Sequence, residues 1–127
     1  MLNVKKTLTK ILDALKADYV VEQGTSGIWT YRKWASGVAE CWGVHSVTIT
    51  HYTTAFGGYA FSTSPNYPAG LFADTPSYFY SARVGNGFSL TGTVLGTSRD
   101  YANLYAICAT SGSQSTDWHL YVIGRWK

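Results

Sequence analysis

Residues 27–44 read GIWTYRKWASGVAECWGV, and this stretch decides the fold class. It contains two runs rich in β-branched and aromatic residues, joined by a short ASG connection at 35–37. Such runs are typical of strands, and a three-residue connection that contains glycine is typical of a β-hairpin. Arg32 in the first strand lies near Glu40 in the second, which predicts an ion pair across the sheet.

Similar runs recur along the rest of the chain, separated by Gly, Ser, Asn, Asp and Pro. Segments 79–84 and 88–95 flank an Asn-Gly pair at 86–87, which readily adopts the positive φ angles of hairpin turns, so a second hairpin is predicted here. Short connections make neighbouring strands antiparallel. We therefore predict that residues 19–127 form an all-β, antiparallel sandwich of about seven strands. The other runs lie at 46–50, 57–61, 100–109 and 118–126.

The N-terminal segment differs from the rest, because residues 3–18 have a helical period. Apolar residues spaced four, three and four apart form a narrow seam of a and d positions. The seam consists of Val4, Leu8, Ile11 and Leu15. A helix this short is marginal in water by itself, and Lys5 and Lys6 are unfavourable near its N-terminal dipole. Residues 1–18 are therefore predicted to be a stem for self-association; the alternative is a helix that packs against its own domain.

The composition agrees with one domain that buries apolar surface between copies. Of the 127 residues, 46% are hydrophobic, 16% aromatic and 13% charged. This length supports a single core, and the aromatic content excludes intrinsic disorder. A typical soluble domain has about 25% charged residues, so the surface is poor in charge for a monomer.

Several classes of partner and environment are excluded by the pattern of charge and cysteine. The net charge is +3 without a basic cluster, which argues against nucleic-acid binding. No apolar run approaches the length of a membrane span, and Lys5, Lys6 and Lys10 rule out a signal peptide. Cys41 and Cys108 match no zinc or redox spacing, and we expect free thiols, as in a chain made in the reducing cytoplasm of a host cell.

Catalysis is not expected. The histidines His45, His51 and His119 form no metal-ligand pattern. The sequence contains no Gly-x-Ser-x-Gly elbow. Few acidic residues are left for the β domain once those of the helical segment are set aside. We predict no metal, no cofactor and no enzymatic activity. A small hydrolase of the cell envelope stays open as an alternative, because sequence alone does not exclude a pair of carboxylates about 5–10 Å apart.

Aromatic residues are the group in excess, and several lie in a segment, 52–80, that the three prolines break. Binding residues tend to lie on long loops of a rigid scaffold, and tyrosine offers both an apolar face and a hydroxyl. The ligand-binding candidates, for a sugar, are Tyr52, Tyr59, Tyr67, Tyr78 and Asn66. The alternative is that these tyrosines cover a small core or a subunit interface.

Two segments carry a resemblance to a known group of proteins. The string IWTYRKWASGVAECWG (28–43) and the terminal YVIGRWK (121–127) resemble the C-terminal regions of phage and prophage tail, fibre and baseplate proteins. The resemblance implies a trimeric virion module in which a helical stem leads into a β-sandwich head, often for recognition of a host surface. The matching residues look structural, and the resemblance carries no sugar site over to 52–80.

From these observations we expect a homotrimeric component of a phage tail or baseplate that contacts other tail proteins and attaches to host surface polysaccharide. It would be located in the virion tail. The alternative to attachment is a purely structural assembly protein whose aromatic residues are buried between subunits.

Overall fold

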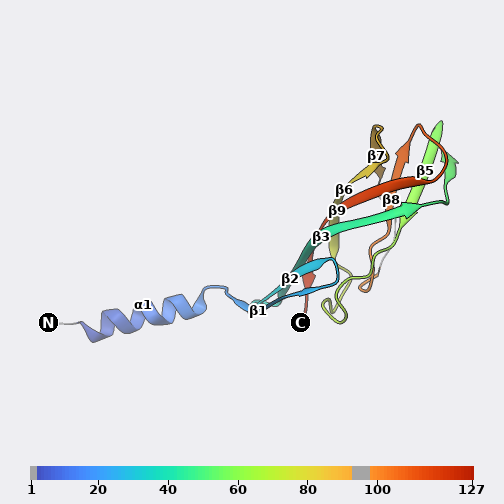
Figure 1. The fold of residues 1–127 in the computed structure, drawn as a ribbon. Coiled ribbons are helices and arrows are strands. Elements are labelled where there is room, and N and C mark those ends of the chain that lie inside the picture. The colour runs from blue at the N-terminus through green and yellow to red at the C-terminus, as the bar shows by residue number, and fades with distance from the viewer. Residues whose placement is uncertain (1–2, 93–97) are drawn as a thin grey trace.

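The computed structural model describes residues 3–92 and 98–127. It consists of one helix that projects from a β body (Figure 1). The helix α1 covers Val4–Lys16. The strands are β1 (Val20–Ser26), β2 (Trp29–Trp34), β3 (Val38–Ile49), β4 (Thr53–Ala55), β5 (Gly58–Thr63), β6 (Ser77–Val84), β7 (Ser89–Gly92), β8 (Leu104–Cys108) and β9 (Gln114–Arg125).

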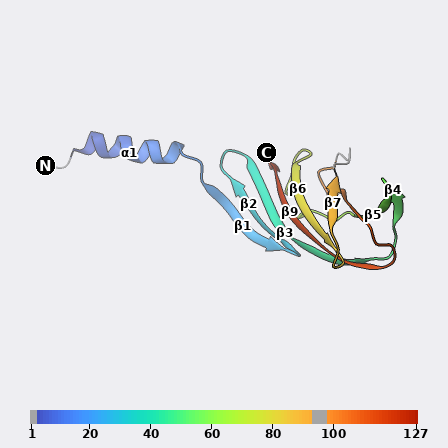
Figure 2. The ribbon, with the colours of Figure 1, turned by 90° about the horizontal axis from the view of Figure 1, so that it is seen from above.

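The strands form two antiparallel sheets, which confirms the predicted all-β, sandwich-like architecture. The larger sheet has the order β1-β2-β3-β9-β6, and these five strands lie side by side in Figure 2. The smaller sheet has the order β4-β5-β8-β7. The hairpin predicted from 27–44 is present as β2 and β3, and Gly37 between them has a φ of 98°. That value lies in the region that favours glycine.

The described residues contain more strands than the sequence predicts, nine instead of about seven. The runs 37–44 and 46–50 are one continuous strand, β3. The additional β1 is an edge strand whose side chains are mostly exposed on both faces, so it lacks the alternation that identifies a half-buried strand. Residues 93–95 of the predicted strand 88–95 lie outside the described residues.

The second predicted hairpin is wrong in its pairing, although the turn itself is present. Gly85 has a φ of 59°, and its N–H donates to the carbonyl of Ser115. However, β6 pairs with β9 in the larger sheet, whereas β7 pairs with β8 in the smaller one. The turn at 85–87 therefore carries the chain from one sheet to the other.

The core lies between the sheets and is closed at one end by the proline-containing segment. Trp118, Phe61 and Leu104 are fully buried between the layers. The Trp29 indole N–H donates to the carbonyl of Asn66 at 2.6 Å, which fastens the segment after β5 over the inner face of β2. Leu71 and Phe72 of this segment belong to the same core. The thiols of Cys41 and Cys108 are free and buried.

The helix α1 extends away from both sheets (Figures 1 and 2). The Asn3 side chain caps it by accepting a hydrogen bond from the Lys6 N–H at 3.0 Å. After the helix, the Asp18 carboxylate accepts hydrogen bonds from the backbone and hydroxyl of Ser36 at 2.9 and 2.6 Å, so the connection is fastened to the β2–β3 turn. No helix in the described part of the chain has the length and apolar character needed to cross a bilayer.

Candidate functional site

The outer face of the larger sheet carries three parallel rows of side chains across β3, β9 and β6. Strand register places residues of the three strands directly opposite one another, and side chains two apart on a strand point to the same face. The first row is Trp42, Tyr121 and Phe79; the second is Val44, His119 and Ser81; the third is Ser46, Asp117 and Arg83.

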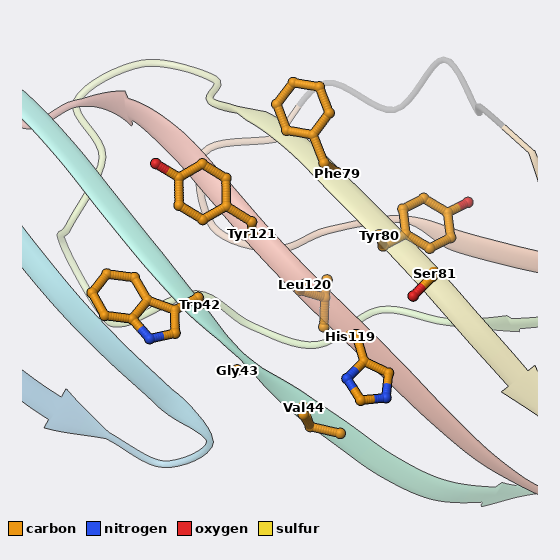
Figure 3. A pocket seen from close by; sticks show the side chains of 9 residues that line it. All are labelled: Trp42, Gly43, Val44, Phe79, Tyr80, Ser81, His119, Leu120 and Tyr121. Atoms are coloured by element: carbon orange, nitrogen blue, oxygen red, sulfur yellow. The ribbon is translucent and has the colours of Figure 1, made fainter.

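The difference in side-chain size between the rows produces a shallow groove. The first row is aromatic, and Phe79 and Tyr121 are 62% and 39% exposed. Val44, His119 and Ser81 of the second row are smaller and form the floor (Figure 3). The third row supplies polar groups along the other side. The first two rows line this groove, which we call the outer-sheet groove, and the first row is its aromatic wall. The third row adjoins the floor beyond the lining residues, and we call it the polar wall.

A network centred on Glu40 holds the aromatic wall in place. The Glu40 carboxylate accepts hydrogen bonds from the Tyr121 hydroxyl and from the Trp34 indole N–H, the latter at 3.2 Å. Its Oε1 lies 3.2 Å from the Arg32 Nε, which confirms the predicted ion pair. The guanidinium of Arg32 in turn lies 4.7 Å from the ring centroid of Trp42, a cation–π distance. Polar contacts thus orient two rings of the aromatic wall, those of Tyr121 and Trp42.

The same network affects the acidity of Tyr121. The hydrogen bond that the hydroxyl donates to Glu40 raises the pKa of Tyr121, with smaller contributions from burial and from the negative charge of the carboxylate. The hydroxyl is therefore protonated at neutral pH and stays a donor to Glu40.

The polar wall is also ordered by its own contacts. The Asp117 carboxylate pairs with Arg83, whose Nε lies at 3.0 Å, and accepts a hydrogen bond from the Ser46 hydroxyl at 2.7 Å. The hydrogen bond from Arg83 and then that from Ser46 lower the pKa of Asp117. The carboxylate is therefore ionised at neutral pH, and its charge is balanced by the guanidinium.

The predicted ligand residues of 52–80 are dispersed by the fold. Tyr67 is buried, its ring packs edge-on against Trp29 and Phe72, and its hydroxyl has no hydrogen-bond partner among the described residues. Burial raises the pKa of Tyr67. Tyr78 is half-buried and donates to the carbonyl of Asn103. These two tyrosines face the core rather than a ligand.

The other candidates do not form one surface either. Tyr52 and Tyr59 contact each other edge-to-face with ring centroids 5.4 Å apart, and Tyr52 also packs on the buried Phe61. Asn66 is exposed but forms an isolated β-bridge with Tyr101. Most of the candidate tyrosines thus pack on the core, and their part in binding stays a prediction.

The seam of α1 faces solvent as far as its side chains are described. Val4, Leu8 and Ile11 are 61%, 54% and 50% exposed. The side chain of Leu15, the fourth predicted seam residue, lies outside the described part of the chain. The three apolar side chains therefore form a stripe that no described residue covers.

The potential metal ligands among the described residues do not cluster. No three His, Cys, Asp or Glu side chains in the described residues lie close enough to hold a metal ion. Of the histidines, His45 lies 3.1 Å from the hydroxyl of Thr63, and burial lowers its pKa. Only His119 reaches the outer-sheet groove.

The sequence contains a signal for the groove in residues that alternate along three strands. Trp42 and Val44, Phe79 and Ser81, and His119 and Tyr121 each occupy positions two apart that face outward. Both faces of these strands therefore carry apolar residues, whereas one solvated face of an antiparallel sheet is usually polar. That excess makes this outer face a candidate binding surface.

Comparison with known proteins gives one structural similarity. No protein-family model matches the sequence, and no curated protein matches it. The fold is similar to that of an N-truncated R1-type pyocin tail fibre, with a TM-score of 0.60 and 11% sequence identity. The similarity covers 97% of this chain and 98% of the other. The two chains therefore share an architecture over nearly their full length.

Proposed function

We propose that the chain is a tail-fibre component of a phage or phage-tail-like particle, located in the tail. The observation that carries this proposal is the likeness of nearly the whole chain to a pyocin tail fibre. The stem-and-head layout is consistent with it, because α1 projects from the β body (Figure 1). Other tail proteins would be its partners in the particle.

We infer further that the chain is a homotrimer assembled through its stem. The 13 residues of α1 are close to the lower limit for a stable helix in water. Its exposed stripe of Val4, Leu8 and Ile11 has the spacing of a coiled-coil seam. Packing the same stripe from several copies buries those side chains and stabilises each helix.

The role proposed for the head is attachment to host surface polysaccharide without a catalytic step. An assembled stem would present several heads at once, and multivalency raises the strength of weak individual contacts. The alternative is a purely structural assembly protein. The exposed apolar side chains Val44, Phe79 and Tyr121 favour that alternative if other subunits cover them.

Two measurements on the full chain test these proposals. Light scattering at micromolar concentration should give the mass of three copies, whereas a monomer contradicts the stem. The labelled protein should bind intact cells of at least one strain in a panel of bacteria, and periodate oxidation of the surface sugars should abolish that binding.

The outcomes of the cell assay separate the candidate functions. Absence of binding throughout the panel contradicts attachment and leaves the structural role. Binding that survives periodate contradicts a glycan receptor. Release of reducing sugars from the purified polysaccharide would contradict the absence of catalysis.

A further inference from the structure

We propose that the outer-sheet groove binds a short, uncharged oligosaccharide that lies across β3, β9 and β6. This inference rests on the proposed attachment to host glycans and assigns it to a place on the head. It replaces the 52–80 segment, whose tyrosines mainly cover the core.

The aromatic wall suits the C–H faces of sugar rings. Trp42, Tyr121 and Phe79 are consecutive in one row across three strands (Figure 3). Adjacent strands are about 4.8 Å apart, so the row extends roughly 10 Å, which fits a short oligosaccharide rather than a single ring. Because Arg32 holds Trp42 and Glu40 holds Tyr121, two of the rings are ordered before a ligand binds, which lowers the entropic cost of binding.

The floor and the polar wall suit sugar hydroxyls. His119 and Ser81 are exposed on the floor, and each side chain offers donors or acceptors. Asp117 and Arg83 lie in the adjoining row, together with Ser46. The hydroxyl groups of a sugar both donate and accept hydrogen bonds. They therefore match a row that contains one hydroxyl, one carboxylate and one guanidinium.

The charge distribution argues for a neutral ligand. Glu40 is paired with Arg32 on one side of the groove, and Asp117 with Arg83 on the other. An anionic or cationic sugar would have to compete with these pairs for its counter-charge. A neutral sugar leaves both pairs intact and needs only hydrogen bonds and stacking.

Both ends of the groove allow a longer chain to continue. On one side β6 is the edge strand of the larger sheet. On the other side, β2 begins at Trp29, which pairs with Gly43. Val44 therefore has no partner in β2, and the floor ends at Val44. An internal stretch of a polysaccharide therefore fits as well as a chain end.

The test compares two exposed phenylalanines in the full chain. The probe is an array of uncharged bacterial surface oligosaccharides, each beside a counterpart that carries a uronic acid or a phosphate. Phe79→Ala removes a ring from the groove, whereas Phe88→Ala removes one that is 82% exposed and lies outside it. Neither ring belongs to the core, so both variants should fold. We expect Phe79→Ala to weaken binding to neutral sugars by about fivefold, and Phe88→Ala to leave it unchanged.

A second variant, Ser81→Arg, fills the floor of the groove with a long charged side chain and should abolish the signal. If both groove variants bind neutral sugars as well as the native protein does, the groove is not the binding site, although glycan attachment itself still holds. Binding confined to the charged counterparts overturns the neutral ligand. Loss of the native mass in Phe79→Ala means that a second copy covers this face, which also overturns the proposal. If neither the array nor intact cells bind the protein, glycan attachment itself fails.

Discussion

At the scale of single residues, the most distinctive segment of the sequence has a physical explanation. Glu40 of β3 accepts hydrogen bonds from the Trp34 indole and the Tyr121 hydroxyl and pairs with Arg32, so residues of β2 and β9 share its carboxylate. Gly43 is required for another reason: a Cβ there would lie 2.2 Å from the carbonyl oxygen of Ile28. These residues hold β2, β3 and β9 together, which agrees with a structural role for the segment.

We predict that Cys41 is inert in the folded protein. Burial, and to a lesser extent the charge of Glu40, raises the pKa of Cys41 to about 12, and only the thiolate reacts with alkylating agents. A short iodoacetamide pulse at pH 8, read by mass spectrometry, should leave Cys41 unmodified in the native protein and label it in guanidinium. Labelling of Cys108, whose thiol donates a hydrogen bond to the carbonyl of Thr110, is measured in the same sample for comparison.

The same shift predicts a dependence of stability on pH. Because folding raises the pKa of this thiol, the thiol stabilises the native state at pH values below its ordinary pKa of 9.0. That contribution to stability is lost as the pH rises toward about 12. The free energy of unfolding should therefore fall over this range, and less so in Cys41→Ala relative to its own neutral-pH value. Rapid native labelling of Cys41 would contradict both expectations.

At the scale of elements, α1 is distinguished by an apolar stripe that no described residue covers. The longer central strands bury their inner faces between the sheets, whereas Val4, Leu8 and Ile11 remain half-exposed or more. Intrinsic propensity alone does not hold a helix of this length together in water. The proposed assembly of several copies would supply the burial that stabilises this element.

We predict that Leu8→Asp combined with Ile11→Asp converts the assembly into monomers. Charges at a and d positions repel one another and lose the apolar burial of the seam. Light scattering should report the mass of one chain, with the melting temperature of the β body unchanged. The matched control, Lys6→Asp with Thr9→Asp, has the same spacing on the opposite side of the helix and should keep the native mass. Dissociation in the control would mean that charge alone, and not the seam, controls assembly.

At the scale of the whole molecule, the stem and the C-terminus lie at one end of the β body, and β4, β5 and β8 extend toward the other (Figure 1). Among the described contacts, the Asp18–Ser36 hydrogen bonds join the end of the stem to the β2–β3 turn. A bundle of stems would therefore hold the heads side by side while each head keeps its own core. Folding and assembly are separate in such a molecule.

This separation predicts that deletion of residues 1–17 yields a folded monomer. Asp18 and its contacts with Ser36 are retained, and the buried residues of the core all lie beyond the deletion. Thermal unfolding followed by near-ultraviolet circular dichroism should shift by less than about 4 °C, the change that roughly 1 kcal/mol produces in a domain of this size. An unfolded product would show that the head needs its neighbours in order to fold.

A structural feature can be predicted from the sequence when the residues that determine it are close together in the chain. The hairpin at 27–44, the turn at 85–87, the helix and the Arg32–Glu40 pair could be predicted, because the residues that determine each of them are neighbours in the chain or on paired strands. The edge strand β1 was not predicted, since its exposed polar residues carry no alternation.

The sequence by itself determined the all-β class, the helical stem and its apolar stripe, because local propensity and hydrophobic period act over a few residues. Only the tertiary structure decided that β6 pairs with β9 rather than with β7, that Tyr67 lies in the core, and that Trp42, Tyr121 and Phe79 meet in one row. Those results depend on strand register between segments far apart in the chain, and register is set by how whole sheets bury their faces.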